Sequence, residues 1–123
     1  MVQPQTRLRV FDNSGAKIVQ CIRTPNKQRS SWGSLILVSV KQLRSKNKIK
    51  LKIKKGSVVF AYVLKATLPL KRIGGSRLKA SSNGVVLLNK QMQPIASRIF
   101  GVVPKELRSS KFLKLITLSG TTI

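Results

Sequence analysis

The chain reads RLRVFDNSGAKIVQCIR over residues 7–23, where two stretches rich in apolar residues flank the turn sequence DNSG at residues 12–15. Asn13 and Gly15 tolerate a backbone with positive φ, so this turn suits a tight connection between two antiparallel strands. The stretch therefore predicts a β-hairpin with strands over residues 7–11 and 17–23.

Short β-branched stretches bounded by turn residues recur along the rest of the chain. They predict further strands over residues 35–42, 58–67 and 85–88, separated by polar connections over residues 24–32 and 68–84. A chain of 123 residues, 41% of them hydrophobic, suits one domain with a single core over residues 1–123. The pattern indicates an all-β barrel or sandwich.

The pattern changes after Pro94. Pro104 suits the first turn of a helix and good helix formers follow it, so a short helix is expected over residues 104–110. Apolar residues beyond it are expected to cover one end of the barrel: Phe112, Leu113, Leu115, Ile116 and Leu118. A helical cover over residues 104–118 is therefore the expected minor α content.

Charge is the most informative property of the composition. The chain has 25 Lys and Arg residues against two acidic residues, for a net charge of +23. Such a charge attracts polyanions, and phosphate neutralisation with release of counterions stabilises it. No stretch reaches the roughly 18 apolar residues of a spanning helix, and the basic stretches lack amphipathic helical spacing. We therefore expect a nucleic-acid partner and no membrane.

Residues 44–55 form a basic arm in which lysines recur at every second position. An extended strand would place its two kinds of residue on opposite faces, with Lys46, Lys48, Lys50, Lys52 and Lys54 on one and Ile49, Leu51 and Ile53 on the other. A solvated edge strand protected by lysine and a strip of phosphate contacts both fit this pattern. The net charge favours the phosphate contacts.

Further basic residues gather in the later connections. Arginine can clamp a phosphate with two hydrogen bonds or stack on a base, so four arginines are better candidates for defined contacts than the lysines: Arg72, Arg77, Arg98 and Arg108. The candidate nucleic-acid contacts are Lys46, Lys48, Lys50, Lys52, Lys54, Lys55, Lys71, Arg72, Arg77, Lys79 and Arg108.

Catalytic chemistry has few residues to draw on. Asp12 and Glu106 are the only carboxylates and the chain has no histidine, so carboxylate-pair, histidine-base and histidine-rich metal sites are nearly excluded. The single Cys21 rules out an internal disulfide and a multi-cysteine metal site, and its apolar surroundings favour a core residue over a reactive thiol. We expect no enzyme activity, cofactor, metal or small-molecule substrate.

A free-standing OB-type protein that binds single-stranded nucleic acid is the alternative function, because a small basic β-barrel suits both. Such binders stack bases on exposed aromatic rings. Trp32, in a polar connection beside Arg29, is the one attractive stacking candidate. A cap over the barrel end is an equally good interpretation of Trp32.

Eight short motifs keep a family's order and spacing over the whole chain. They are VQPQT at residues 2–6, DNSGA at 12–16, CIR at 21–23, KKG at 54–56, VLLN at 86–89, QPI at 93–95, RIFG at 98–101 and ELRS at 106–109. On these motifs the chain resembles the universal ribosomal protein L-fourteen family of the large subunit. Both acidic residues lie inside the motifs.

The resemblance implies a small five-stranded, OB-like β-barrel with a projecting basic β-ribbon and short C-terminal helices. It also implies a structural role in translation, with large-subunit rRNA as partner, ribosomal proteins L-three and L-nineteen as neighbours, and a bridge to small-subunit rRNA. In bacterial-type and organellar members, the surface matching Ser97, Arg98 and Lys114 receives the ribosome silencing factor. Here Ser97 replaces the usual threonine and keeps the hydroxyl.

The chain also departs from the family pattern. Neutral residues stand where the family commonly has Asp or Glu, at Ser34, Gln42, Ser57, Gly74, Ser81 and Ser110. The basic arm is longer than in typical bacterial members, and the connection that contains Trp32 is shorter. Such drift, with the bacterial-type motifs kept, is typical of an organelle. We expect a mitochondrial ribosome, with a plastid or a bacterial cytoplasm as the alternatives.

Overall fold

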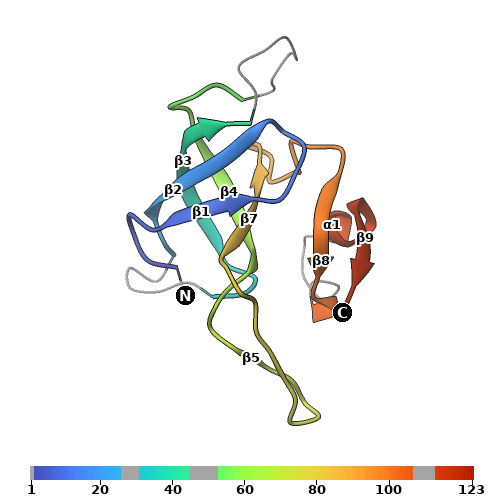
Figure 1. Cartoon of the computed structure of the whole chain (residues 1–123). Helices are drawn as coiled ribbons and strands as arrows, with labels where there is room; N and C mark the ends of the chain where they lie inside the picture. The colour runs from blue at the N-terminus through green and yellow to red at the C-terminus, as the bar shows by residue number, and fades with distance from the viewer. Residues whose placement is uncertain (1, 26–30, 45–52, 107–112) are drawn as a thin grey trace.

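Five strands close into a barrel in the order β1-β2-β3-β4-β7 (Figure 1). The structure is a computed structural model that describes residues 2–25, 31–44, 53–106 and 113–123. The barrel strands are β1 (Arg7–Val10), β2 (Ala16–Arg23), β3 (Leu35–Leu43), β4 (Val58–Lys65) and β7 (Gly84–Leu88). All five predicted strands are therefore confirmed. Neighbouring strands are antiparallel except β1 and β7, whose parallel pairing closes the barrel.

Alternation along the strands fills the barrel interior. Leu8 and Val10 on β1 are buried while Arg7 and Arg9, which alternate with them, are exposed, because successive side chains of a strand point to opposite faces. The pairing of β2 with β3 shifts register on both sides of Ile18. Ala16 is buried before this shift, and Val19 and Cys21 are buried after it. The bulge thus keeps apolar residues inside a barrel that has to curve.

Strands β4 and β7 are buried on both faces. Ala61 pairs with Leu87 inside the barrel, and Tyr62 pairs with Val86 on the outer face. This explains why both strands read as nearly continuous apolar runs in the sequence, since strands covered on both sides lose the alternation of polar residues. The outer face of β4 and β7 therefore needs a second layer.

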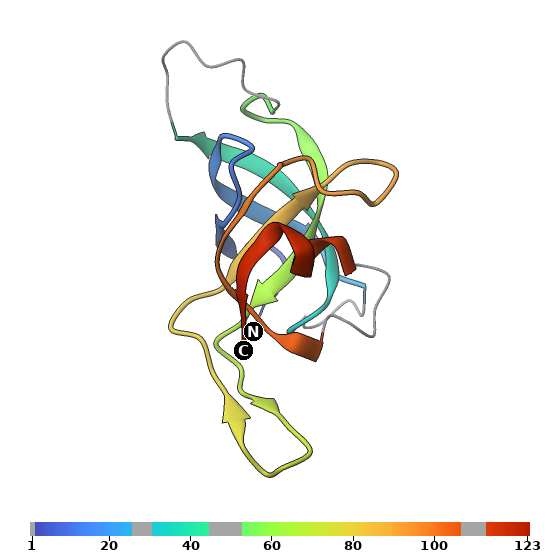
Figure 2. The ribbon, with the colours of Figure 1, turned by 90° about the vertical axis from the view of Figure 1, so that its right-hand side faces the viewer.

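The C-terminal part of the chain supplies that layer, seen beside the barrel in Figure 1 and in front of it in Figure 2. It contains β8 (Ile99–Val103), α1 (Leu113–Leu118) and β9 (Ser119–Thr122), with β8 and β9 pairing in parallel. Four residues pack on the outer face: Ile99, Val103, Leu115 and Ile116. Parallel strands need a crossover, which here includes α1. The strands predicted from the sequence include neither β8 nor β9.

The predicted apolar cover is confirmed in part, but it lies on the outer face of β4 and β7 and not over an end of the barrel. Leu115 and Ile116 are buried and Leu118 packs against the same cluster, whereas Leu113 is 53% exposed. Phe112 lies outside the described residues. Most of the helix expected over residues 104–110 also lies outside them, and residues 105–106 form a 3₁₀ turn.

A hairpin projects from the barrel between β4 and β7 (Figures 1 and 2). Its strands are β5 (Leu70–Lys71) and β6 (Arg77–Leu78). Residues 68–84, interpreted above as a polar connection, thus include a short antiparallel ladder. This hairpin is not the basic ribbon expected over residues 44–55. Of that stretch, residues 45–52 lie outside the described residues. Ile53 is buried in the barrel core, and a turn follows it. A ribbon there stays a prediction.

Candidate nucleic-acid interface

Most of the described candidate cations lie on the surface. The exposed ones are Lys54, Lys55, Lys71, Arg77 and Lys79. Arg72 is half-buried. The remaining candidates, Lys46, Lys48, Lys50, Lys52 and Arg108, lie outside the described residues.

Lys54 and Lys55 belong to a turn that is fastened to β3. The backbone N of Gly56 donates to Val40 O at 2.8 Å, and Val40 N donates to Ser57 O at 3.0 Å. Gly56 has φ of 83°, a conformation that glycine adopts without steric cost. The turn therefore holds two exposed lysines at the base of the basic arm.

On the projecting hairpin, Lys71 and Arg77 are direct cross-strand partners and both are exposed. Residues directly opposite each other in an antiparallel pair share a face, and like charges at such positions are destabilising. An anion between the two side chains would remove this repulsion. The pair is therefore a candidate phosphate contact.

Arg72 differs from its neighbours because its guanidinium already has protein partners. Its Nε lies 2.9 Å from Glu106 Oε1 without the alignment of a hydrogen bond, and its Nη2 donates to Glu106 Oε2 at 3.3 Å. Nη2 also donates to Ile123 O at 2.8 Å. Arg72 therefore ties the hairpin to the C-terminal layer, and this occupies much of its capacity to bind phosphate.

The second acidic residue, Asp12, is fully buried. Its Oδ1 accepts hydrogen bonds from the backbone N and the hydroxyl of Ser14, and its Oδ2 accepts one from Leu87 N at 3.1 Å. Both acidic residues thus serve the fold. Neither lies free on the surface to offset the cations there.

Three further cations gather around a hollow of about 770 Å³ beside β1: Arg9, Lys17 and Arg44. Arg44 Nη2 donates to Val10 O at 2.8 Å, and its guanidinium lies 5.3 Å from the centroid of the Phe100 ring. These three residues are not among the contacts predicted from the sequence. The alternation of Leu8 and Val10 would have placed Arg9 outward, but only the closed barrel shows that the three meet.

The surface expected to receive a silencing factor is held by the hairpin turn. Asn13 Oδ1 accepts hydrogen bonds from Ser97 N at 3.1 Å and Arg98 N at 3.2 Å, and Asn13 Nδ2 donates to Ser97 Oγ at 3.0 Å. The side chains of Ser97, Arg98 and Lys114 are exposed. Lys114 lies on α1. Arg98 and Lys114 line different hollows, both of which border α1.

Trp32 caps the barrel. Its ring is half-buried against the interior cluster, and its Nε1 donates to Leu68 O at 2.6 Å. Of the two interpretations left open above, the structure supports the cap. Cys21 is buried in the same cluster, and burial raises the pKa of its thiol, which favours an unreactive core residue.

Among the residues that the structure describes, no helix is long and apolar enough to cross a membrane. The same residues contain no group of three or more His, Cys, Asp or Glu side chains that could hold a metal ion.

Comparison with known proteins identifies the family. The family model described as ribosomal protein L14p/L23e matches residues 1–123. The chain belongs to this family. A relative from the bacterium Carsonella ruddii (strain PV), named large ribosomal subunit protein uL14, is 42% identical over 126 residues, covering 100% of both chains. Membership of the L14p/L23e family gives this protein a structural role in the large ribosomal subunit and no enzymatic one.

Proposed function

We propose that this L14p/L23e protein binds large-subunit rRNA mainly through phosphate contacts made by its exposed cations. The observation that carries the proposal is the cross-strand pair of Lys71 and Arg77, whose like charges face each other on an exposed hairpin. No acidic side chain is available to pair with Lys71 or Arg77, because Asp12 is buried and Glu106 is bound to Arg72. Phosphate is the counter-charge that a ribosome supplies in quantity.

The other proposed rRNA contacts extend this pair over the surface. Lys54 and Lys55 lie on the turn fastened to β3, and Lys79 follows the hairpin. Lys46, Lys48, Lys50, Lys52 and Arg108 stay in the proposal on the sequence pattern. Arg72 is the weakest member, because its guanidinium is bound to Glu106 and Ile123.

The finer assignments follow from the family resemblance. The protein contributes to a bridge with small-subunit rRNA and has ribosomal proteins L-three and L-nineteen as neighbours. The surface of Ser97, Arg98 and Lys114 docks a ribosome silencing factor through an acidic face of that factor. Support for this comes from the exposure of all three side chains and from Asn13, which fixes the backbone of residues 97–98.

The compartment that we propose is the mitochondrion. The support is the near-complete loss of acidic residues, with two left in a chain of 123, while the bacterial-type motifs are kept. The relative from Carsonella ruddii is equally compatible with a bacterial cytoplasm. Sequencing the rRNA of the particle that contains this chain separates a mitochondrial, a plastid and a bacterial ribosome.

Salt dependence of RNA binding tests the proposed function. If the full chain neutralises about six to ten phosphates of an rRNA fragment, affinity falls roughly 10³- to 10⁵-fold between 50 and 200 mM salt. Replacing Lys71 and Arg77 by Gln should lower the slope of log affinity against log salt by about two, one for each contact. The control replaces Lys41 and Lys90 by Gln, which removes the same charge at two exposed positions outside the proposed contacts. A flat salt dependence, or equal slopes for both variants, contradicts the proposal.

A further inference from the structure

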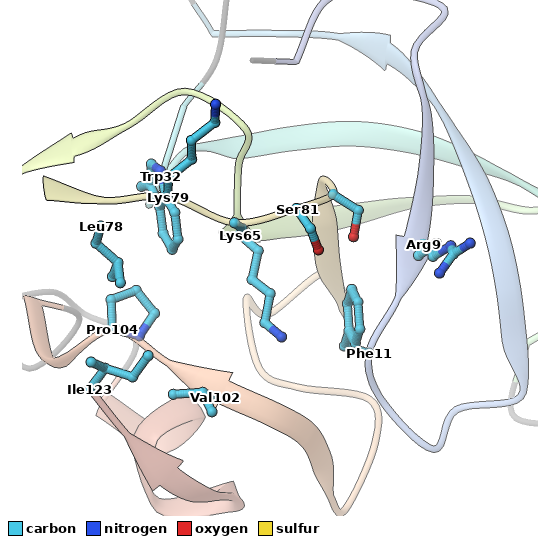
Figure 3. A pocket seen from close by; sticks show the side chains of 12 residues that line it. Arg9, Phe11, Trp32, Lys65, Leu78, Lys79, Ser81, Val102, Pro104 and Ile123 are labelled. Atoms are coloured by element: carbon cyan, nitrogen blue, oxygen red, sulfur yellow. The ribbon is translucent and has the colours of Figure 1, made fainter.

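A hollow of about 420 Å³ lies where the barrel, the projecting hairpin and the C-terminal layer meet (Figure 3). Its volume falls in the range of roughly 300 to 1,000 Å³ that is usual for sites that take a small ligand. Phe11 and Lys65 come from the barrel, Leu78 from the hairpin, and Pro104 from the segment after β8. Three separate parts of the chain thus build its walls.

The hollow has an apolar side and a cationic side. Leu78, Val102 and Pro104 gather on one side, as Figure 3 shows, and Lys65 projects from β4 toward Phe11 on the other. Arg9 and Lys79 also border the hollow, and their charged ends lie away from its centre. A ligand that matches these walls has a flat or apolar part joined to an anionic group.

Lys65 is held in place by its surroundings. Its Nζ lies 4.5 Å from the centroid of the Phe11 ring, a cation–π distance. A Cβ added at Gly101 would lie 2.8 Å from this Nζ, and one added at Gly84 would lie 2.2 Å from Cε2 of Phe11. The ammonium and the ring therefore occupy space that two glycines leave free, so the site is built before any ligand arrives.

No Asp or Glu side chain neutralises the cations of this hollow. Its lining residues include neither type, and the two acidic side chains of the chain are engaged elsewhere, Asp12 with Ser14 and Leu87 and Glu106 with Arg72. Among the lining residues, Ile123 has its main-chain O bound by Arg72 at 2.8 Å. A cation in a partly enclosed site without an acidic partner attracts an anionic group strongly. In a protein with a net charge of +23, that group is best supplied by RNA.

We infer that this hollow binds one unpaired nucleotide of RNA, with its phosphate at Lys65 and its base against the apolar wall of Leu78 and Pro104. The inference rests on the proposed RNA binding and adds to it a defined subsite. A stacked, paired base offers no free face, whereas a nucleotide turned out of its stack does, as in protein recognition of loops and bulges. Duplex RNA should therefore bind the protein without filling the hollow.

Trp32 makes occupancy of the hollow measurable, because it borders the hollow and is the only tryptophan of the chain. Titrating the full chain with single-stranded oligouridylate should change its tryptophan emission, while duplex RNA and inorganic tripolyphosphate bind without that change. Lys65→Gln should weaken the oligouridylate titration roughly tenfold, since hydrogen bonds to charged groups are among the stronger ones. Lys65→Arg should retain binding. Lys90→Gln, on an exposed turn outside the hollow, should alter affinity less than twofold.

The inference is overturned if duplex RNA, tripolyphosphate or an oligoglutamate changes the emission as oligouridylate does, or if Lys65→Gln and Lys90→Gln weaken binding equally. Should Lys65→Gln fail to fold, Leu78→Ser takes its place, because it removes part of the apolar wall and leaves every proposed phosphate contact unchanged; a smaller loss of oligouridylate affinity is expected. Filter binding of duplex RNA separates the two proposals. Salt-dependent duplex binding together with no tryptophan response to oligouridylate defeats the subsite alone, and absence of both responses defeats the proposed function as well.

Discussion

Oδ2 of Asp12 accepts a hydrogen bond from Leu87 N at 3.1 Å, across 75 positions of sequence. The other carboxylate oxygen accepts from Ser14 N at 3.0 Å. One fully buried side chain thus joins the turn between β1 and β2 to β7, the strand that closes the barrel. Asp12, one of the two acidic residues of the chain, is therefore a part of the barrel closure.

Asp12→Asn should destabilise the protein by about 1 to 3 kcal/mol. The amide of Asn keeps the shape of the carboxylate, but its NH₂ group replaces one of the two accepting oxygens. This NH₂ would face the N–H of either Ser14 or Leu87, and that buried N–H would lose its acceptor. Urea denaturation measures the free energy of unfolding. Glu106→Gln removes the same charge from a residue whose side chain is 40% exposed, so it should cost less than about 1 kcal/mol. Equal costs for the two variants would show that burial of Asp12 is not what matters.

Gly84→Ala should also destabilise the barrel, by about 1 to 3 kcal/mol, because overpacking forces the neighbouring ring to move. The new Cβ would lie 2.2 Å from the Phe11 ring, where the parallel pair of β1 and β7 closes the barrel. Gly120→Ala is the control, since open space surrounds Gly120 and its cost should stay within about 0.5 kcal/mol. Thermal denaturation of both variants checks the difference. An unchanged melting temperature for Gly84→Ala contradicts the packing described.

The ion pair of Arg72 and Glu106 should add little to stability. Their coupling, measured with Arg72→Gln and Glu106→Gln in a double-mutant cycle, is expected to be below about 1 kcal/mol and to shrink as salt is added, since Glu106 is partly exposed. Arg72→Gln alone should cost more than Glu106→Gln alone, because it also removes the hydrogen bond to Ile123 O. A coupling free energy above about 2 kcal/mol that does not change with salt concentration would mean that water does not reach the pair.

Reversing Arg98 and Lys114 to Glu should slow and weaken the docking of the silencing factor through like-charge repulsion, while assembly into the large subunit is retained. The measurement is pull-down of the factor by large subunits that carry the double reversal. Subunits with Lys41 and Lys90 reversed to Glu provide the same change of charge on exposed residues elsewhere. Undiminished recovery by the Arg98 and Lys114 variant would show that this surface is only solvated.

The barrel strands could be predicted because each carries its own signal. Val38 and Val40 alternate with polar or exposed residues on β3, and DNSG marks the first turn. The pairing of β8 with β9 has no such signal, because it joins segments separated by residues 104–118 and uses a strand of sequence SGTT. Strands β5 and β6 have two residues each, too short for a periodic pattern.

The candidate interface was predictable as a set of charges and much less as a set of sites. Alternation places Arg9 outward, and composition makes Lys71 and Arg77 attractive, but only the register shows that the last two face each other. Arg72 reads as a free cation in sequence, whereas the fold brings Glu106 to it across 34 positions. The hollow at Lys65 likewise depends on contacts among three distant segments, which no local pattern records.

Sedimentation of a cell or organelle lysate through a sucrose gradient tests directly whether this protein is part of the large ribosomal subunit. We expect the protein, followed with an antibody, to sediment with the large ribosomal subunit and with whole ribosomes, because its +23 charge is neutralised there by rRNA. Dissociating the ribosomes at low magnesium should move the protein to the large-subunit peak and leave the small-subunit peak empty of it. Protein found at the top of the gradient, with none at the large-subunit peak, would contradict the account.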